Sequence, residues 1–178
     1  MGVRLLRLVL LPGLSLAIAA QAPAGALEVR LRTLFPTAVS FSPKDGVPPH
    51  YRAYAPNPRG GDPIIVGYAF FTTDLEPLES GYDGPIQMLV GINPRGVIAG
   101  VIVTAHHEPY GYFSVEPPEF AAQFAGKDVR DPFKVGGDIE AISRATITIN
   151  SATRAIRNSV RRFARQMLAP PSAEGGKG

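Results

Sequence analysis

The sequence of 178 residues contains no cysteine and no tryptophan. Without a thiol the chain cannot form a disulfide, ligate an iron–sulfur cluster through thiolates, attach haem through thioethers, use a cysteine nucleophile or carry a lipid on cysteine. Any redox chemistry must therefore come from a cofactor that needs no thiol. Charge is also sparse, at 19% of residues, whereas a hydrophobic content of 45% is ordinary for a globular protein. The length suits one domain with a substantial core.

The N-terminus has the features of a secretory signal peptide. Arg4 and Arg7 form a positively charged start, residues 8–20 are mainly apolar, and Ala24-Gly25-Ala26 supplies the small residues of a cleavage site. The apolar run of 13 residues is shorter than the roughly 20 needed to cross a bilayer. We therefore expect residues 1–26 to be a signal peptide, the mature protein to be periplasmic, and no integral membrane span to remain after cleavage. An uncleaved membrane anchor is the alternative.

Cleavage after Ala26 would remove two arginines and no acid, which leaves 16 basic residues against 15 acidic ones. So small an excess of positive charge does not indicate a nucleic-acid partner. Residues 169–178 are small and polar residues that cannot pack, and we expect them to be a disordered tail. Residues 27–168 then remain as a single domain.

Three apolar stretches rich in β-branched residues predict strands. Residues 86–92 and 97–103 flank Asn93-Pro94-Arg95-Gly96, in which proline fixes φ and glycine tolerates a positive φ, so this region predicts a hairpin. Residues 64–71 predict a third, buried strand. Gly67 would weaken that strand unless another group packs closely against it.

Helical spacing and turn residues divide the rest of the domain. The spacing of apolar residues over 27–34 predicts a short amphipathic helix that ends before Pro36. Residues 118–124 also predict a short helix. Residues 43–63 hold six prolines and three glycines, so we expect a long surface loop with no regular element. Residues 127–137 are also expected to be a loop.

A long helix is predicted over residues 148–168, with Thr148 or Asn150 as its cap. Apolar residues recur at every third or fourth position: Ile149, Ala152, Ile156, Val160, Phe163 and Met167. The opposite face, expected to be solvated, carries four arginines: Arg154, Arg157, Arg161 and Arg165. These elements predict the α+β class: a small, mainly antiparallel sheet packed against a long C-terminal helix, with a Pro-rich surface loop.

Two glycine-bearing stretches can line a binding site. In Gly81-Tyr82-Asp83-Gly84-Pro85, the glycines would let backbone N–H groups approach a ligand, although a plain turn is the alternative. In residues 106–112, the adjacent histidines would point to opposite faces of a strand, so a shared metal ion is not expected. These residues can instead lie beside a planar cofactor, with Tyr110 and Tyr112 supplying apolar faces. Ordinary hydrogen bonding is the alternative.

Two polar stretches precede the long helix. Asp138 and Glu140 are an acidic pair for which a solvated loop is the expectation. In residues 141–148, serine and threonine hydroxyls can simply cap the helix. Alternatively, free N–H groups, the helix dipole and Arg144 can bind an anion there, and a phosphate fits such a site.

Residues 142–148 resemble the S-G-A-T-x-T signature of the FMN-binding domain family. That family includes the RnfG and NqrC subunits of membrane electron-transfer complexes and the N-terminal domain of NosR/NirI-type regulators, and the likeness is closest to the periplasmic domain of those regulators. The resemblance covers about residues 27–168. Other motifs recur in the same order in the NosR/NirI branch: Leu34-Phe35-Pro36, Gly67-Tyr68-Ala69-Phe70, Gly81-Tyr82-Asp83-Gly84-Pro85, Leu89-Val90-Gly91-Ile92 and His106-His107-Glu108-Pro109.

The resemblance implies that a flavin transferase attaches FMN through its phosphate to Thr146. Ser143, Arg144 and Ala145 would complete the phosphate site. Residues that would flank the flavin ring are Gly81, Tyr82, Gly84 and Pro85 of the first stretch and His107, Glu108 and Gly111 of the second. Two positions depart from the family pattern. Arg144 replaces a glycine, and it can either pair with the phosphate or obstruct the transferase. In the E-T-P-G-x-G loop of the RnfG type, only Glu108 and Gly111 match.

The expected function is therefore an exported FMN carrier that passes electrons between membrane or periplasmic partners in respiration or metalloenzyme maturation. Such a protein is an electron-transfer flavoprotein rather than a free-standing enzyme. The alternative is a non-redox regulatory or assembly module of the same fold without covalent flavin, in which Arg144 marks the loss of attachment. A metal-binding protein that uses His106 or His107 is a third possibility.

Overall fold

The structure, a computed structural model, describes residues 25–168. The predicted signal peptide, apart from its last two residues, and the predicted tail at 169–178 lie outside the described residues. Five antiparallel strands form one sheet in the order β1-β2-β3-β4-β5. Their bounds are Ser40–Phe41 (β1), Tyr51–Ala55 (β2), Ile64–Phe71 (β3), Gln87–Ile92 (β4) and Ile98–Ala105 (β5).

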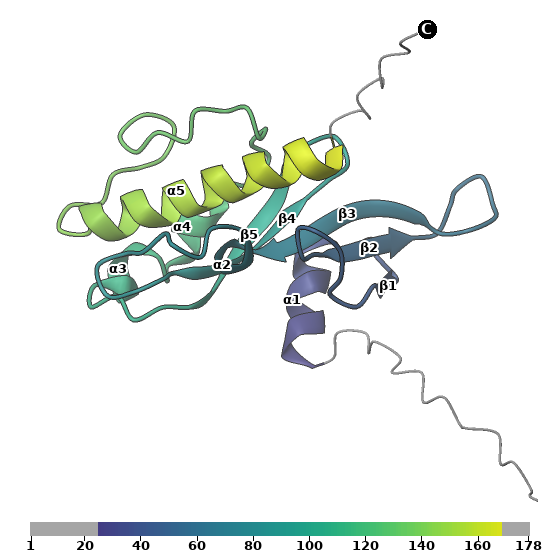
Figure 1. Ribbon diagram of the computed structural model, residues 1–178, viewed down its shortest axis with the longest axis horizontal. Helices are drawn as coiled ribbons and strands as arrows, with labels where there is room; N and C mark the ends of the chain where they lie inside the picture. Colours follow the sequence, from purple (N-terminus) through teal and green to yellow (C-terminus); the bar gives the residue numbers. More distant parts are fainter. Residues whose placement is uncertain (1–24, 169–178) are drawn as a thin grey trace, which may run out of the picture.

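Two helices cover opposite faces of the sheet (Figure 1). α1 (Ala26–Leu34) packs on one face, and α5 (Thr146–Phe163), continued by a π-helical turn η1 (Ala164–Leu168), packs on the other. The predicted α+β fold, an antiparallel sheet against a long C-terminal helix, is confirmed. The connections contain three short helices: α2 (Thr72–Leu75), α3 (Gly111–Ser114) and α4 (Pro118–Ala122). Across residues 25–168, no helix has the length and apolar character needed to cross a membrane.

The sheet is buried on both faces because its apolar side chains alternate between them. In β4, Met88 and Val90 join the core beneath α5, whereas Leu89 between them joins the core around α1. α5 contributes its predicted apolar positions to the first core, and all of those within the helix are buried: Ile149, Ala152, Ile156, Val160 and Phe163. The alternation fixes the register, since a shift of one residue would move every side chain of the strand to the opposite face and disrupt the packing of both cores.

Gly67 allows α1 and its following residue to pack directly on the sheet. A Cβ at Gly67 would lie 2.1 Å from Cε1 of Phe35, so the ring occupies the space that a side chain would need. A Cβ at Gly91 would lie 3.1 Å from Cζ of the same ring. The close packing that the sequence required at Gly67 is therefore present.

The prediction that residues 43–63 contain no regular element is wrong. β2 lies within that range and pairs with β1 on one side and β3 on the other. The prolines come before and after the strand, so they remove no hydrogen-bond donor from its ladder. Its buried side chains alternate at Tyr51, Ala53 and Ala55, as the strand period requires. The Pro-rich loop is thus divided, and residues 56–63 form the tip of the β2–β3 hairpin (Figure 1).

α5 begins at Thr146, and the prediction that Thr148 or Asn150 caps it is wrong. Ala145 is at the N-cap position and makes no side-chain cap. Thr148 is buried, and its hydroxyl donates to Glu108. Asn150 donates its side-chain N–H to the carbonyl of Thr146, 2.8 Å away. A contact between distant segments has therefore replaced the local cap.

The sequence predicts a solvated arginine face on α5, but two of its arginines contact neighbouring loops. Its arginines hold the connection after α2 and the long loop after α4, which arches over α5 in Figure 1. Arg154 pairs with Glu79 at 2.7 Å, and Arg161 donates to the carbonyls of Val129 at 3.2 Å and Asp131 at 2.8 Å. Arg162, next to Arg161 in the sequence, pairs with Glu76 at 3.1 Å.

Asp138 also departs from the expected solvated loop. Its carboxylate accepts a hydrogen bond from the N–H of Lys134 at 2.6 Å and pairs with the ammonium of Lys127 at 3.1 Å. Burial raises the pKa of Asp138, but these hydrogen bonds and the nearby positive charge outweigh it and lower the pKa. The carboxylate therefore stays charged and fixes the loop that covers α5.

Candidate functional site

Glu108 joins three segments that are distant in the sequence. It lies in the loop after β5 and is buried, with 6% of its surface exposed. Its carboxylate accepts hydrogen bonds from the N–H of Tyr82 at 3.1 Å, from the N–H of Asp83 at 2.9 Å and from the hydroxyl of Thr148. The turn at residues 81–85, the loop after β5 and the start of α5 are thereby held together, at the end of the molecule where α3 lies beside α5 (Figure 1).

Glu108 is negatively charged at neutral pH. Burial raises the pKa of Glu108, but the hydrogen bonds from Thr148, Asp83 and Tyr82, together with the attraction of His106, outweigh burial and lower the pKa below its ordinary value. His106 accepts the N–H of Glu108 at Nδ1, 3.1 Å away. The carboxylate is therefore a charged acceptor whose bonds are stronger than those of a neutral one.

Two glycines make room for this arrangement. A Cβ at Gly81 would lie 2.4 Å from Oε1 of Glu108, and a Cβ at Gly111 would lie 2.1 Å from Cε1 of His106. The backbone of the first turn thus approaches a carboxylate of the chain itself. Gly84 closes that turn at a φ of 97°, and its carbonyl accepts the N–H of Gly81 at 2.8 Å.

The first turn of α5 has free hydrogen-bond donors. Thr146 is the first helical residue, and its side chain is exposed. In the part of the chain that the structure describes, no acceptor takes the N–H groups of Thr146, Ile147 or Thr148, as is usual for an uncapped helix start. Together with the helix dipole, these groups favour a negatively charged group at Thr146, and a phosphate is one such group.

A hollow of about 250 Å³ opens beside Thr146. Two tyrosines, from the turn and from the loop that Glu108 holds, form its walls together with the residues that begin α5. Tyr82 is 69% exposed and Tyr110 is 50% exposed, so their rings are accessible to a planar ligand. The lining residues are Tyr82, Tyr110, Arg144, Ala145, Thr146, Ile147 and Thr148.

Arg144 has a backbone conformation that glycine adopts most easily. Its φ is 69°, in the left-handed region, where a side chain costs roughly 1–2 kcal/mol. The left-handed backbone at this position explains why the S-G-A-T-x-T signature has a glycine there, because glycine has no side chain to strain. Arg144 is exposed and is among the residues that line the hollow beside Thr146.

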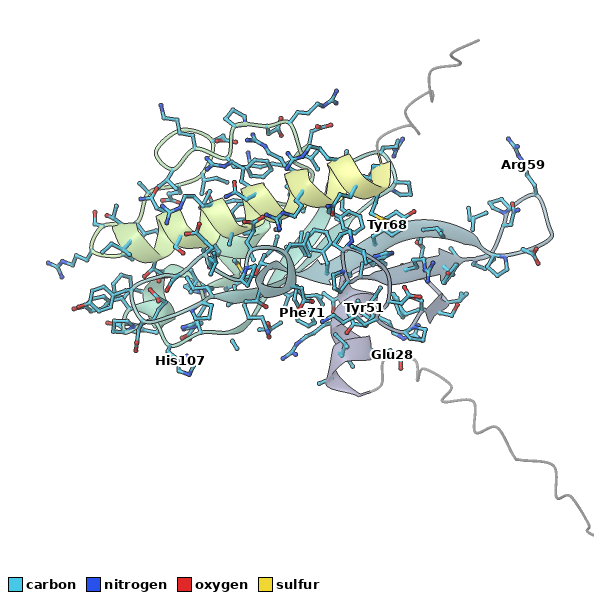
Figure 2. All side chains as sticks on the ribbon, in the orientation of Figure 1. Glu28, Tyr51, Arg59, Tyr68, Phe71 and His107 are labelled. Atoms are coloured by element: carbon cyan, nitrogen blue, oxygen red, sulfur yellow. The ribbon has the colours of Figure 1, made fainter. Side chains whose placement is uncertain are left out.

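The structure gathers only some of the predicted site residues around the hollow. Tyr82, Arg144, Ala145 and Thr146 line it, and Glu108 and the glycines hold its walls. Ser143, Gly84, Pro85, His107 and Tyr112 do not line it. His107 is exposed and points outward at the lower edge of the molecule in Figure 2.

Two features of the site had no signal in the sequence. Thr148 and Glu108 are 40 residues apart, so no local pattern could pair them. Ile147 is 57% exposed at the hollow although its residue type favours burial. Across residues 25–168, no group of three or more His, Cys, Asp or Glu side chains is placed to hold a metal ion.

Residues 81–161 match the model of the FMN-binding domain family. The match contains all three segments that Glu108 joins. The resemblance to this family is therefore confirmed over these residues, whereas the closer likeness to NosR/NirI-type regulators stays a prediction.

The chain is also similar to components of ion-translocating complexes. It is 33% identical over 108 residues to a component of the ion-translocating oxidoreductase complex of Pseudomonas aeruginosa, covering 53% of this chain and 50% of that protein. It is 36% identical over 92 residues to the component of the same name from Escherichia coli, covering 46% and 43%. It is 30% identical over 104 residues to a component of the Na(+)-translocating ferredoxin:NAD(+) oxidoreductase complex of Acetobacterium woodii, covering 54% and 48%. The chain thus spans about half the length of the curated relatives it matches.

Proposed function

We propose that the chain is an exported flavoprotein module that carries FMN on Thr146 and passes electrons between partner proteins, on the premise that residues 81–161 match the model of the FMN-binding domain family. The observation that carries the proposal is the setting of Thr146. Its hydroxyl is exposed on the first turn of α5, next to free backbone N–H groups and beside a hollow walled by two tyrosines. A phosphoester on Thr146 would have both donors for its phosphate oxygens and a place for its ring.

Each part of the site then has a defined task. FMN would supply the redox chemistry, because its ring accepts and gives up electrons. The N–H groups at the start of α5 and the guanidinium of Arg144 bind the phosphate oxygens. Tyr82 and Tyr110 lie against the ring, with the loop at residues 107–111 on the side of Tyr110. Glu108 is a positioning residue, because its carboxylate accepts hydrogen bonds from all three segments and so holds them in place.

The partners follow from the attachment and from the relatives. Formation of the phosphoester joins the hydroxyl oxygen of Thr146 to the FMN phosphorus, with loss of the hydroxyl proton and of the group that leaves that phosphorus, and it requires a flavin transferase with an activated flavin donor. Since relatives of the chain are components of ion-translocating oxidoreductase complexes, we propose electron-transfer partners in the membrane or the periplasm. The N-terminal residues support export through a signal peptide. The exported protein should begin at Leu27 by N-terminal sequencing, and an exported chain that begins at Met1 would contradict cleavage.

Co-expression with a flavin transferase tests the proposal. The chain should remain yellow after denaturation and precipitation, because the flavin is covalent. Thr146→Ala should be colourless with an unchanged far-UV circular dichroism spectrum, since an exposed hydroxyl outside a cap adds little stability. Thr37→Ala, which removes an exposed threonine hydroxyl outside residues 81–161, is the matched control and should stay yellow.

A second candidate function follows from Arg144, whose side chain stands at a position with a left-handed backbone. In that case the chain is a non-redox regulatory or assembly module without covalent flavin. A wild-type chain that is colourless after co-expression, while Arg144→Gly becomes yellow, would favour this module.

A further inference from the structure

A second hollow, of about 310 Å³, lies between α5 and the loop that covers it. It shares no lining residue with the hollow at Thr146. Thr153 is two helical turns after Thr146, which places the two about 10 Å apart along the helix axis. The residues that line the second hollow are Phe133, Lys134, Val135, Asn150, Thr153, Arg154 and Arg157.

The second hollow is positively charged. Lys134, Arg154 and Arg157 line it, and no acidic side chain does. Arg154 is paired with Glu79 at 2.7 Å. Among residues 25–168, neither Lys134 nor Arg157 forms an ion pair with an acid. Within this part of the chain, two cations of the hollow therefore have no acidic partner, and only Nε of Arg157 has a side-chain acceptor, Oδ1 of Asn158 at 3.4 Å.

Thr153 adds a buried donor that the chain itself does not use. The residue is 2% exposed, and its hydroxyl has no hydrogen-bond partner among the described residues. A threonine inside a helix commonly bonds to the carbonyl four residues earlier, and a buried polar group left without a partner costs about 1–3 kcal/mol. A ligand oxygen in the hollow would satisfy this hydroxyl.

We propose that the second hollow binds a phosphate group, either as free phosphate or as the monoester of a small molecule. A phosphate has three or more acceptor oxygens and about 1.5 to 2 negative charges at neutral pH, so it can accept from a guanidinium, an ammonium and a hydroxyl at once. A carboxylate has one charge and two oxygens and matches the three donors less well. This site is separate from the FMN attachment and does not depend on it.

Titration with inorganic phosphate, followed by amide NMR at constant ionic strength, tests the site. The chain is produced without a flavin transferase, so that the outcome is independent of flavin attachment. Phosphate should shift the amides of residues 133–135 and 150–157 with one saturable curve. Succinate carries two charges but places them on separate carboxylates, so it should bind more weakly. Shifts that do not saturate, that scatter over the whole chain, or that succinate reproduces equally would overturn the proposal.

Four variants assign the donors. Arg157→Gln and Lys134→Gln should each weaken phosphate binding about tenfold, the effect of losing one charge-assisted hydrogen bond. Thr153→Val should weaken it similarly, whereas Thr153→Ser should retain it. Arg59→Gln is the matched control, because Arg59 lies at the far tip of the β2–β3 hairpin (Figure 2) and loses the same charge. If Arg157→Gln, Lys134→Gln and Thr153→Val bind phosphate as tightly as this control, the assignment of the donors is wrong.

The stability of Thr153→Val gives an independent readout. Valine has the shape of threonine without the hydroxyl, so it removes a buried donor that has no partner. Without phosphate this variant should be at least as stable as the wild type, and phosphate should raise its melting temperature less. Glycerol phosphate distinguishes the source: tighter binding than inorganic phosphate indicates a monoester, and weaker binding indicates the free ion. If neither anion binds, the proposal fails while the flavin test on Thr146 is unaffected.

Discussion

Glu108→Gln should destabilise the fold by leaving one backbone donor without an acceptor. Oε1 of Glu108 accepts the N–H of Asp83, and Oε2 accepts the N–H of Tyr82 and the hydroxyl of Thr148. Glutamine offers one oxygen and one NH₂ group in the same shape. The hydroxyl of Thr148 can rotate to accept from that NH₂, but a backbone N–H cannot. In either orientation of the amide, the N–H of Tyr82 or of Asp83 therefore faces another donor.

The magnitude follows from that single lost acceptor. A buried donor without a partner costs about 1–3 kcal/mol. Because these two N–H groups belong to a partly exposed turn, we expect the lower part of the range, about 1–2 kcal/mol, which lowers the folding equilibrium constant roughly 5- to 30-fold. Urea unfolding followed by circular dichroism measures this loss. Amide exchange at Tyr82 and Asp83 should accelerate at the same time, because the turn opens more easily.

The pH dependence of the same variant checks the charge of Glu108. Its folded pKa is lowered, so its stabilising effect is complete above the unfolded pKa of about 4.3 and is lost as the pH falls through the folded pKa. The stability difference between wild type and Glu108→Gln should therefore shrink from pH 7 to pH 3. Glu119→Gln, on the exposed surface of α4, is the control and should change stability at neither pH.

The refuting result is specific. If Glu108→Gln unfolds at the same urea concentration as wild type and the two amides exchange at unchanged rates, Glu108 does not hold the turn to α5. A stability loss that is constant with pH would show instead that the shape of the side chain matters and its charge does not.

Three further predictions concern other parts of the fold. Arg144→Gly should raise the free energy of unfolding by about 1 kcal/mol, because glycine relieves the left-handed strain, whereas Arg144→Ala should give no gain; urea unfolding of both variants decides this. Gly67→Ala should destabilise by about 1–3 kcal/mol, because its Cβ would collide with the ring of Phe35. Phe35→Leu should reduce that penalty in a double-mutant cycle, and strict additivity would contradict the packing. In the flavin-loaded chain, Tyr110→Leu should alter the absorption spectrum and midpoint potential, whereas Tyr112→Leu, outside the hollow, should not; equal effects of the two would place the ring elsewhere.

The sequence predicted those parts of the fold that have strong local signals. The hairpin of β4 and β5 followed from two β-branched stretches around Asn93-Pro94-Arg95-Gly96, and it is present as predicted. The long helix followed from apolar residues at every third or fourth position, which are buried on the sheet. In both cases the period of the side chains decides which face is buried, and this can be seen within one segment.

Other features were hidden because they depend on distant contacts. β2 was missed because the surrounding prolines suggested a loop, although the strand itself contains none. The predicted start of α5 was wrong because the hydroxyl of Thr148 was interpreted as a helix cap. In the structure this hydroxyl donates a hydrogen bond to the carboxylate of Glu108. Gly81 was expected to admit a ligand, but the space that its missing side chain leaves is filled by the carboxylate of Glu108. No pattern within a single segment identifies such partners.

Peptide mapping of the flavin-loaded chain tests the central claim most directly. Trypsin should cleave after Arg144 and Arg154, which releases residues 145–154 with both Thr146 and Thr148 in one peptide. We expect an added mass of FMN less one water on that peptide, with fragment ions that assign it to Thr146. Assignment of the added mass to Thr148, or its absence from every peptide after co-expression with a competent transferase, would contradict attachment at Thr146.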